Sequence, residues 1–239
     1  MKRWLLGTAL GASLALGGMA TASAAVIELA LAVDASSSIS DTEWALQMQG
    51  YANAINAVLP TDSTVAVSVI RFATSASVVM GMTEITSVSD RTDLANFFLG
   101  LSQDGNGDLT CITCAIEAAE GTLDGDALTK GVIDVSTDGV FTAGFNPNSD
   151  ETVVGSAEWA VLNDADVVNA LGIGTGTAPD FAHGDDSFSI LAASFAEFEA
   201  ALIEKLRRET GQDVPEPAAL GLFGAMLAGF GLVARRRRA

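Results

Sequence analysis

The sequence predicts one α/β domain with a largely parallel central sheet flanked by helices. Apolar, β-branched segments of strand length, such as residues 64–73 and 131–137, alternate with segments whose apolar residues recur at helical spacing. Alternating strands and helices build a sheet of mainly parallel strands, because each helix carries the chain back across the sheet. Residues 25–213 lie between two apolar terminal segments, and their length fits a single domain.

The expected strands and helices follow from local patterns. The apolar run that starts at Val26 ends at Asp34, and Ser40 then provides an N-cap for a helix that stops before Pro60. The remaining elements are, in chain order, a strand over 64–73, a short strand over 76–80 paired with it, a helix over 90–101, a helix over 111–123, a strand over 131–137, a helix near 151–164, a strand over 167–173, a loop over 174–187, a short strand over 188–192 and a helix over 195–208.

The N-terminal segment has the order of a secretory signal peptide. A short basic start is followed by a stretch of mostly Leu, Ala and Gly, and then by the small residues Ala22-Ser23-Ala24. We therefore expect signal peptidase to remove residues 1–24, which places the domain outside the cytoplasm. The alternative is an N-terminal membrane anchor. The small residues at the end of the segment and the strand pattern that starts directly after them disfavour it.

The C-terminal segment, residues 214–239, has three parts. Pro215-Glu216-Pro217 is followed by an uncharged apolar stretch over 218–234 and by four arginines. The stretch spans roughly 25 Å as a helix, near the lower limit for a short transmembrane helix, and the arginines should stay cytoplasmic. The segment resembles the PEP-CTERM sorting signal of Gram-negative bacteria. That resemblance implies recognition by an exosortase, cleavage near the motif, and export to the cell surface or biofilm matrix; a plain membrane anchor is the alternative.

The domain between these segments is strongly acidic. Residues 25–213 hold six lysines and arginines against 29 aspartates and glutamates, a formal charge of −23. Such a surface repels nucleic acid and anionic lipid, so we expect no nucleic-acid partner and membrane contact only through the C-terminal segment. The charge suits divalent cations or a saline medium, and solubility alone explains it equally well.

Two cysteines, Cys111 and Cys114, are spaced C-x-x-C. Zinc would need more ligands, and the single histidine, His183, is remote in sequence. In an exported protein we interpret the pair as a local disulfide, because residues at i and i+3 of a helix come close enough to bridge. A redox centre is the alternative.

Oxygen-bearing side chains follow the predicted strands at three places. Asp34, Ser36 and Ser38 come directly after the first strand, Thr110 stands before a helix, and Asp138 ends a buried strand. The carboxyl ends of parallel strands meet at one edge of a sheet, where ligands of such folds bind. Mg²⁺ prefers oxygen ligands and keeps part of its water shell. The pattern therefore predicts a site for Mg²⁺, or for Ca²⁺ or Mn²⁺, at this edge.

This arrangement resembles the von Willebrand factor type A domain, a Rossmann-like fold, and its metal-ion-dependent adhesion site (MIDAS), over residues 26–209. The resemblance implies that Ser36, Ser38 and Thr110 offer hydroxyl oxygens to the metal and that Asp34 and Asp138 hold it mainly through water. It also implies that the metal accepts an acidic side chain of a partner. Thr113 is the alternative to Thr110. The sequence itself resembles more closely an exported bacterial family of unknown function. The segments that carry this resemblance are residues 32–39, 110–116, 132–139, 168–173 and 198–209.

Enzyme motifs are weak in this chain. There is no G-x-S-x-G elbow to accompany His183, and no phosphate-binding G-x-x-x-x-G-K-[ST] loop. Asp104, Asn106 and Asp108 resemble the start of a calcium loop, but the glycine and glutamate that such a loop needs are absent. We therefore expect that this protein is not an enzyme. We expect a metal-dependent adhesion protein that binds an acidic protein or an anionic polysaccharide. A structural matrix component without metal-dependent binding is the alternative, and a polysaccharide hydrolase is a weaker one.

Overall fold

The computed structural model describes residues 26–104, 106–126 and 128–212. The predicted signal peptide and the Pro215-Glu216-Pro217 motif with its apolar stretch lie outside these residues. Within the described ranges, no helix is both long and apolar enough to cross a membrane.

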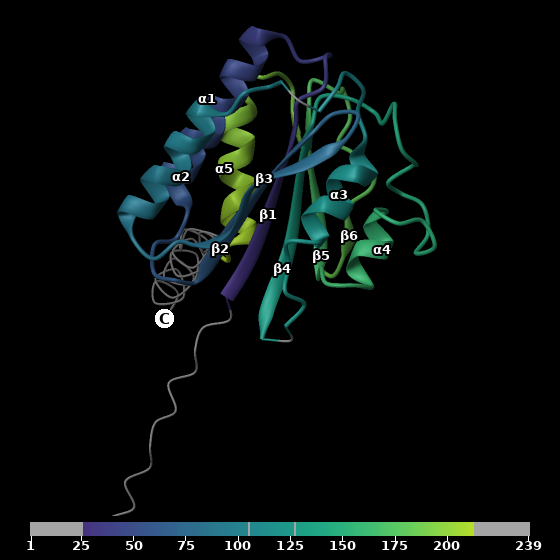
Figure 1. Ribbon diagram of the computed structural model, residues 1–239. Helices are drawn as coiled ribbons and strands as arrows, with labels where there is room; N and C mark the ends of the chain where they lie inside the picture. The colour runs from purple at the N-terminus through teal and green to yellow at the C-terminus, as the bar shows by residue number, and fades with distance from the viewer. Residues whose placement is uncertain (1–25, 105, 127, 213–239) are drawn as a thin grey trace, which may run out of the picture.

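One mixed sheet forms the centre of the domain (Figure 1). The described part of the chain contributes seven strands in the order β3-β2-β1-β4-β5-β6, with β7 paired to β5. They are β1 (Val26–Asp34), β2 (Val65–Phe72), β3 (Ala76–Glu84), β4 (Thr129–Thr137), β5 (Val167–Ile173), β6 (His183–Gly184) and β7 (Ser189–Ala192). Strands β2, β1, β4, β5 and β7 are mutually parallel, whereas β3 and β6 run antiparallel at the edges. The prediction of a largely parallel sheet is confirmed.

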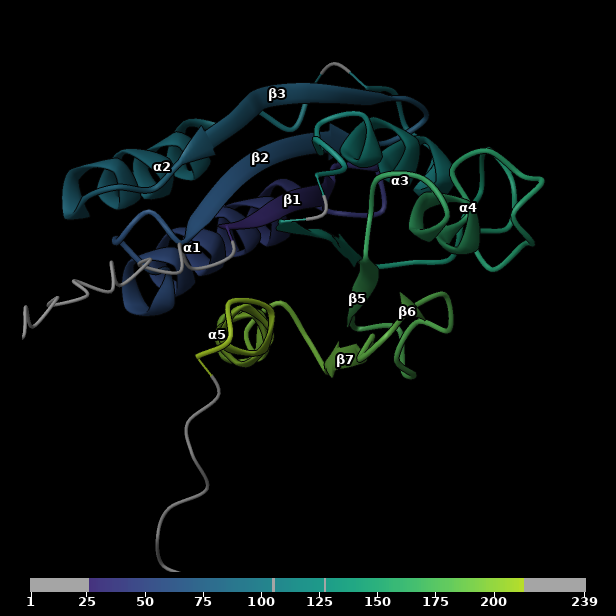
Figure 2. The same cartoon turned by 90° about the horizontal axis from the view of Figure 1, so that it is seen from below.

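Helices cover both faces of the sheet. Helices α1 (Asp41–Val58), α2 (Val88–Gly100) and α5 (Phe198–Glu209) lie on one side, and α3 (Ile112–Glu120) and α4 (Ala157–Val161) on the other, as Figures 1 and 2 show. Alternate side chains of β1 belong to the two hydrophobic cores on either face of the sheet. Leu29 and Leu31 pack toward the α1 side, and Ala30 and Ala32 pack toward the α3 side. Burial on both faces explains why the central strands read as continuous apolar runs.

Helix α1 begins with a complete capping box. The Ser40 side chain accepts a hydrogen bond from the backbone N–H of Glu43, and the Glu43 carboxylate accepts one from the Ser40 backbone N–H. These bonds fix where the helix starts, at Asp41, seven residues after Asp34 ends β1. The loop between them is therefore held at both ends.

Several predicted elements need correction. The short strand expected over 76–80 is β3, which continues to Glu84, and the helix expected over 111–123 ends at Glu120. The helix expected near 151–164 is only α4, because Gly155 has φ +80° and Ser156 caps the helix behind it. The loop expected over 174–187 contains β6, which pairs with the start of β5. The helix expected from residue 195 starts at Phe198, after a turn closed between Glu197 and Ser194.

Candidate metal site

The loops that follow β1 and β4 meet at one edge of the sheet, at the top of Figure 1. These strands are hydrogen-bonded neighbours in parallel register, with Val33 opposite Ser136. Asp34 and Thr137, the last residues of the two strands, and Asp138, the next residue, are therefore brought to the same place by the sheet alone.

Asp34 is fixed through both carboxylate oxygens. Its Oδ1 accepts a 2.9 Å hydrogen bond from the Ser36 backbone N–H, and its Oδ2 accepts a 2.6 Å bond from the Thr137 hydroxyl. The residue is fully buried. A buried carboxylate without such donors would be costly, so these bonds determine how it points.

A chain of hydroxyls links the β1 loop to Asp138. Ser38 Oγ donates a 2.9 Å hydrogen bond to Oδ1 of Asp138, and the Ser36 and Ser38 hydroxyls are 2.9 Å apart. Since the single Ser38 proton goes to Asp138, Ser36 must be the donor to Ser38. Four of the five predicted ligands thus form one hydrogen-bonded group with Thr137.

Thr110 lies at the same edge and is held through its backbone. Its N–H donates to the Thr142 hydroxyl at 2.8 Å, and its carbonyl accepts from the N–H groups of Thr142 and Ala143. The next residue, Cys111, donates to the carbonyl of Ala73, just beyond β2. Within the described residues, no hydrogen bond connects the Thr110 hydroxyl to the four linked ligands.

Thr113, the alternative to Thr110, is engaged elsewhere. Its hydroxyl accepts a 3.2 Å hydrogen bond from the Phe145 N–H and lies 3.7 Å from the Cys111 sulfur. Cys111 and Cys114 are joined by a disulfide in the first turn of α3. The disulfide and the Thr113 bond together fix the segment that follows Thr110.

The site raises the pKa of both carboxyls. Burial raises the pKa of Asp34 to about 6, against the hydrogen bonds from Thr137 and Ser36, and the charge of Asp138 adds to the rise. Burial also raises the pKa of Asp138, against the hydrogen bond from Ser38. Asp34 is fully buried and Asp138 is half-buried, and in the described part of the chain neither carboxylate has a positive partner, which a bound cation would provide.

The donor set fits a hard divalent cation. Nowhere in the described ranges do three or more His, Cys, Asp or Glu side chains gather as a metal cluster. The candidate site instead combines two carboxylates with the hydroxyls of Ser36, Ser38 and Thr110, and it contains oxygen donors alone. Mg²⁺, Ca²⁺ and Mn²⁺ favour such ligands over nitrogen and sulfur.

Sequence reasoning missed two residues that support this site. Thr137 donates to Asp34, and its place directly before Asp138 in a buried strand was the available signal. Gln103 binds the loop from outside, with its Nε2 donating to the carbonyls of Ser36 at 3.2 Å and Ile39 at 2.8 Å. No local pattern distinguishes that glutamine from a solvent-exposed one.

The remaining motif residues take other roles. Asn106, from the partial calcium pattern, accepts a hydrogen bond from Arg71 and donates one to Ser77, so its side chain is engaged within the fold. His183 lies in β6 opposite Val168, at the beginning of β5 and thus at the other end of the sheet from Asp34.

Solved structures with the same fold are proteins of low sequence identity. The proximal thread matrix protein 1 of the mussel byssus matches with a TM-score of 0.62 and 18% identity over 78% of this chain and 47% of that chain. The same protein, described with a zinc-occupied MIDAS motif, matches with a TM-score of 0.59 and 20% identity over 76% and 46%. BatB from Bacteroides thetaiotaomicron matches with a TM-score of 0.53 and 16% identity over 77% and 99%.

These matches establish a von Willebrand A-like fold. This chain spans about half the length of the mussel protein, so only a domain of that protein is comparable. No curated protein sequence matches this chain. The family described as "Protein of unknown function (DUF1194)" matches residues 24–214, which include the whole domain between the terminal segments. The chain therefore belongs to the DUF1194 family, with a von Willebrand A-like fold.

Proposed function

We propose that this protein is a metal-dependent binding protein that holds an acidic group of its partner through a divalent cation. The observation that carries the proposal is the hydrogen-bonded group at the carboxyl edge of the sheet, where Asp34, Ser36, Ser38 and Asp138 converge. A structural neighbour described with zinc in a MIDAS motif supports it.

Each residue has a distinct task in this proposal. Ser36, Ser38 and Thr110 would offer hydroxyl oxygens to Mg²⁺, or to Ca²⁺ or Mn²⁺, and Asp34 and Asp138 would supply the negative charge. Thr137 and the Ser36 N–H would orient Asp34. The cation would supply positive charge for a carboxylate of the partner. We propose binding and no catalysis, since the serine and threonine hydroxyls gathered here are assigned to the cation as ligands.

We further propose that the protein acts outside the inner membrane. The support comes from sequence: residues 1–24 resemble a signal peptide, and residues 214–239 resemble a PEP-CTERM segment read by an exosortase. Among the structural neighbours are a byssus matrix protein and a pilus adhesin from Lactobacillus rhamnosus GG, which matches with a TM-score of 0.59 at 16% identity. The partner would be an acidic protein or an anionic polysaccharide of the cell surface or biofilm matrix.

Isothermal titration of the purified protein with Mg²⁺, Mn²⁺ and Ca²⁺ tests the metal site. We expect one saturable site in the wild type and its loss in Asp138→Ala. Asp93→Ala is the matched control, because Asp93 is an exposed carboxylate on α2 whose loss changes the net charge equally. Identical titrations of the wild type and Asp138→Ala would refute the metal site. Retention on cells in the presence of a chelator would instead favour a structural matrix role without metal-dependent binding.

A further inference from the structure

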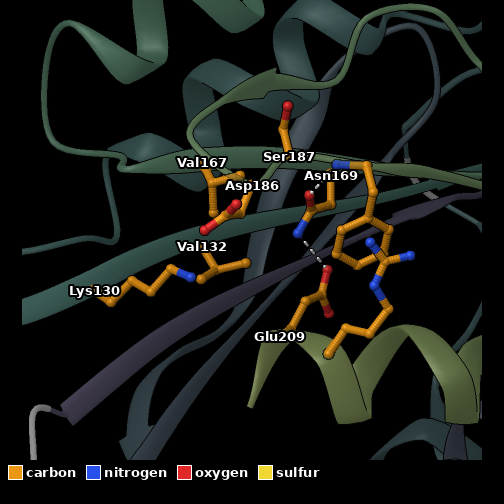
Figure 3. A pocket seen from close by; sticks show the side chains of 9 residues that line it. Lys130, Val132, Val167, Asn169, Asp186, Ser187 and Glu209 are labelled. Atoms are coloured by element: carbon orange, nitrogen blue, oxygen red, sulfur yellow. Dashed lines mark hydrogen bonds between the residues drawn. The ribbon is translucent and has the colours of Figure 1, made fainter. Parts of the chain in front are cut away.

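A pocket lies near the starts of β4 and β5, at the end of the sheet opposite the candidate metal site, and Figure 3 shows the side chains that line it. It has a volume of about 550 Å³, within the usual range for small-molecule sites. Its lining comes from the starts of β4 and β5, the segment after β6 and the end of α5: Lys130, Val132, Val167, Asn169, Asp186, Ser187, Phe188, Arg208 and Glu209. Along β4, from Lys130 to Asp138, the two places are separated by roughly 26 Å at the usual strand rise.

The wall of this pocket rests on a buried charged cluster. The Lys205 amine lies 2.6 Å from Oδ1 of Asp134 and donates to Oε1 of Glu209 at 2.7 Å. Asn169 Nδ2 donates to the same Glu209 oxygen at 3.0 Å, and Asn169 Oδ1 accepts from the Phe188 N–H. Glu209 Oε2 is buried and has no hydrogen-bond partner among the described residues.

Burial favours the neutral form of the Glu209 carboxyl. Burial, together with the charge of Asp134, raises the pKa of Glu209 to about 8, against the opposing effect of Lys205. Because Oε1 already accepts from Lys205 and Asn169, the proton of Glu209 belongs on Oε2. Oε2 is shielded from solvent, so this proton stays inside the protein and the cluster supports the pocket from beneath.

Positive charge gathers at the same pocket in an otherwise acidic domain. Of the six lysines and arginines in residues 25–213, Lys130 and Arg208 line the pocket and Lys205 lies beneath it. The Arg208 guanidinium stacks on the Phe188 ring at 3.6 Å from its centroid. Figure 3 shows the Lys130 amine directed toward the other lining side chains. Asp186 also lines the pocket and offsets part of this charge, but Lys130 and Arg208 still offer cationic groups to an anion that the acidic surface would otherwise repel.

We propose that this pocket binds a small hydroxylated carboxylate of sugar-acid size. The carboxylate would be held by Lys130 and Arg208, which line the pocket. Asp186 and Ser187 supply acceptors for ligand hydroxyls on the other side of the pocket. A simple cation would meet Lys130 and Arg208 at close range, and a large apolar ligand would find only Val132, Val167 and the Phe188 ring.

Glucuronate is the probe for this proposal, with glucose and propionate as the matched ligands that lack the carboxylate or the hydroxyls. Isothermal titration of the full chain in buffer freed of divalent ions should give a Kd on the order of 1 mM or lower for glucuronate. Glucose and propionate should bind at least about tenfold more weakly. Metal-free conditions separate this site from the proposed metal site.

The variants Lys130→Gln and Arg208→Gln should each weaken glucuronate binding about tenfold, which corresponds to about 1.4 kcal/mol. Arg207→Gln is the control, because Arg207 is an exposed neighbour on α5 that does not line the pocket. Thermal unfolding of each variant checks that it is folded. Glucose binding as tight as glucuronate, equal affinity in Lys130→Gln and the wild type, or no binding of glucuronate at all would each overturn the proposal.

Discussion

The hydroxyl of Thr137 donates a 2.6 Å hydrogen bond to Oδ2 of Asp34 and so joins the end of β4 to the end of β1. Both residues are fully buried. The bond orients the carboxylate that stands at the base of the candidate metal site, before any ion is considered. The site is therefore preorganised by the two central strands, whose register the apolar cores on both faces determine.

Thr137→Val tests this contact, since valine keeps the shape and removes the donor. We expect a loss of about 1–3 kcal/mol in the free energy of unfolding, because Asp34 Oδ2 is left without its partner in a buried place. Urea unfolding followed by circular dichroism measures it. Thr92→Val, at an exposed hydroxyl on α2, is the control and should change stability far less. Equal losses of stability in the two variants would show that the Thr137 hydrogen bond stabilises the fold no more than an exposed hydroxyl does.

Lys205→Met tests the buried charged cluster. Methionine fills much the same space but leaves Asp134 and Glu209 buried without their shared cation, so we expect a loss of about 3–5 kcal/mol in stability at neutral pH. Arg207→Met, on the exposed side of the same helix, should be nearly neutral. Denaturant unfolding measures the change in stability of both variants. A small loss of stability in Lys205→Met would mean that the cluster is better solvated than its burial indicates.

Glu209→Gln tests the protonation of the same cluster. The pKa of Glu209 is about 8 in the folded protein, against an ordinary value of 4.5. Between these values the folded state keeps a proton that the unfolded state has lost, so this contribution is complete below pH 4.5 and disappears as the pH rises through 8. Relative to Glu209→Gln, the wild type should lose stability by up to about 1 kcal/mol per pH unit over this range. Parallel stability curves for both proteins would contradict the raised pKa.

Reduction of the Cys111–Cys114 disulfide should lower stability modestly. The bond closes a very short loop, for which chain entropy predicts about 2 kcal/mol. Urea unfolding with and without dithiothreitol measures the effect, and the double variant Cys111→Ser and Cys114→Ser should show no response to the reductant. A change well above this value would indicate that the disulfide also maintains the packing of α3 and Thr110.

The fold and the placement of the candidate ligands could be predicted from sequence, because both follow from strand ends. An apolar strand that stops at Asp34 and another that stops before Asp138 must bring these residues to one edge of a parallel sheet. The helix near 151–164 could not be predicted correctly, because a single positive-φ glycine at 155 interrupts a pattern that otherwise reads as helical. The contact between Thr137 and Asp34 depends on the register of two strands that are distant in sequence.

The pocket at the other end of the sheet was not foreseen for a different reason. Lys205 and Glu209 share the helical spacing of the buried residues of α5, but as charged residues near the end of a helix they are expected to be solvated, like the exposed Arg207 and Arg208. Asp134 gave the better signal, because a carboxylate within a buried apolar strand requires a partner. Which residue provides that partner depends on how α5 packs on the sheet.

The most direct test of the central claim is the number of divalent ions that each chain binds in its candidate site. Electron paramagnetic resonance of Mn²⁺ titrated into the purified protein counts bound ions, and Mg²⁺ then competes for them. We predict one tight Mn²⁺ per chain that Mg²⁺ displaces, retained in Asp93→Ala and lost in both Ser36→Ala and Asp138→Ala. Tight Mn²⁺ binding that survives in Ser36→Ala and Asp138→Ala, or its absence from the wild type, would contradict the account.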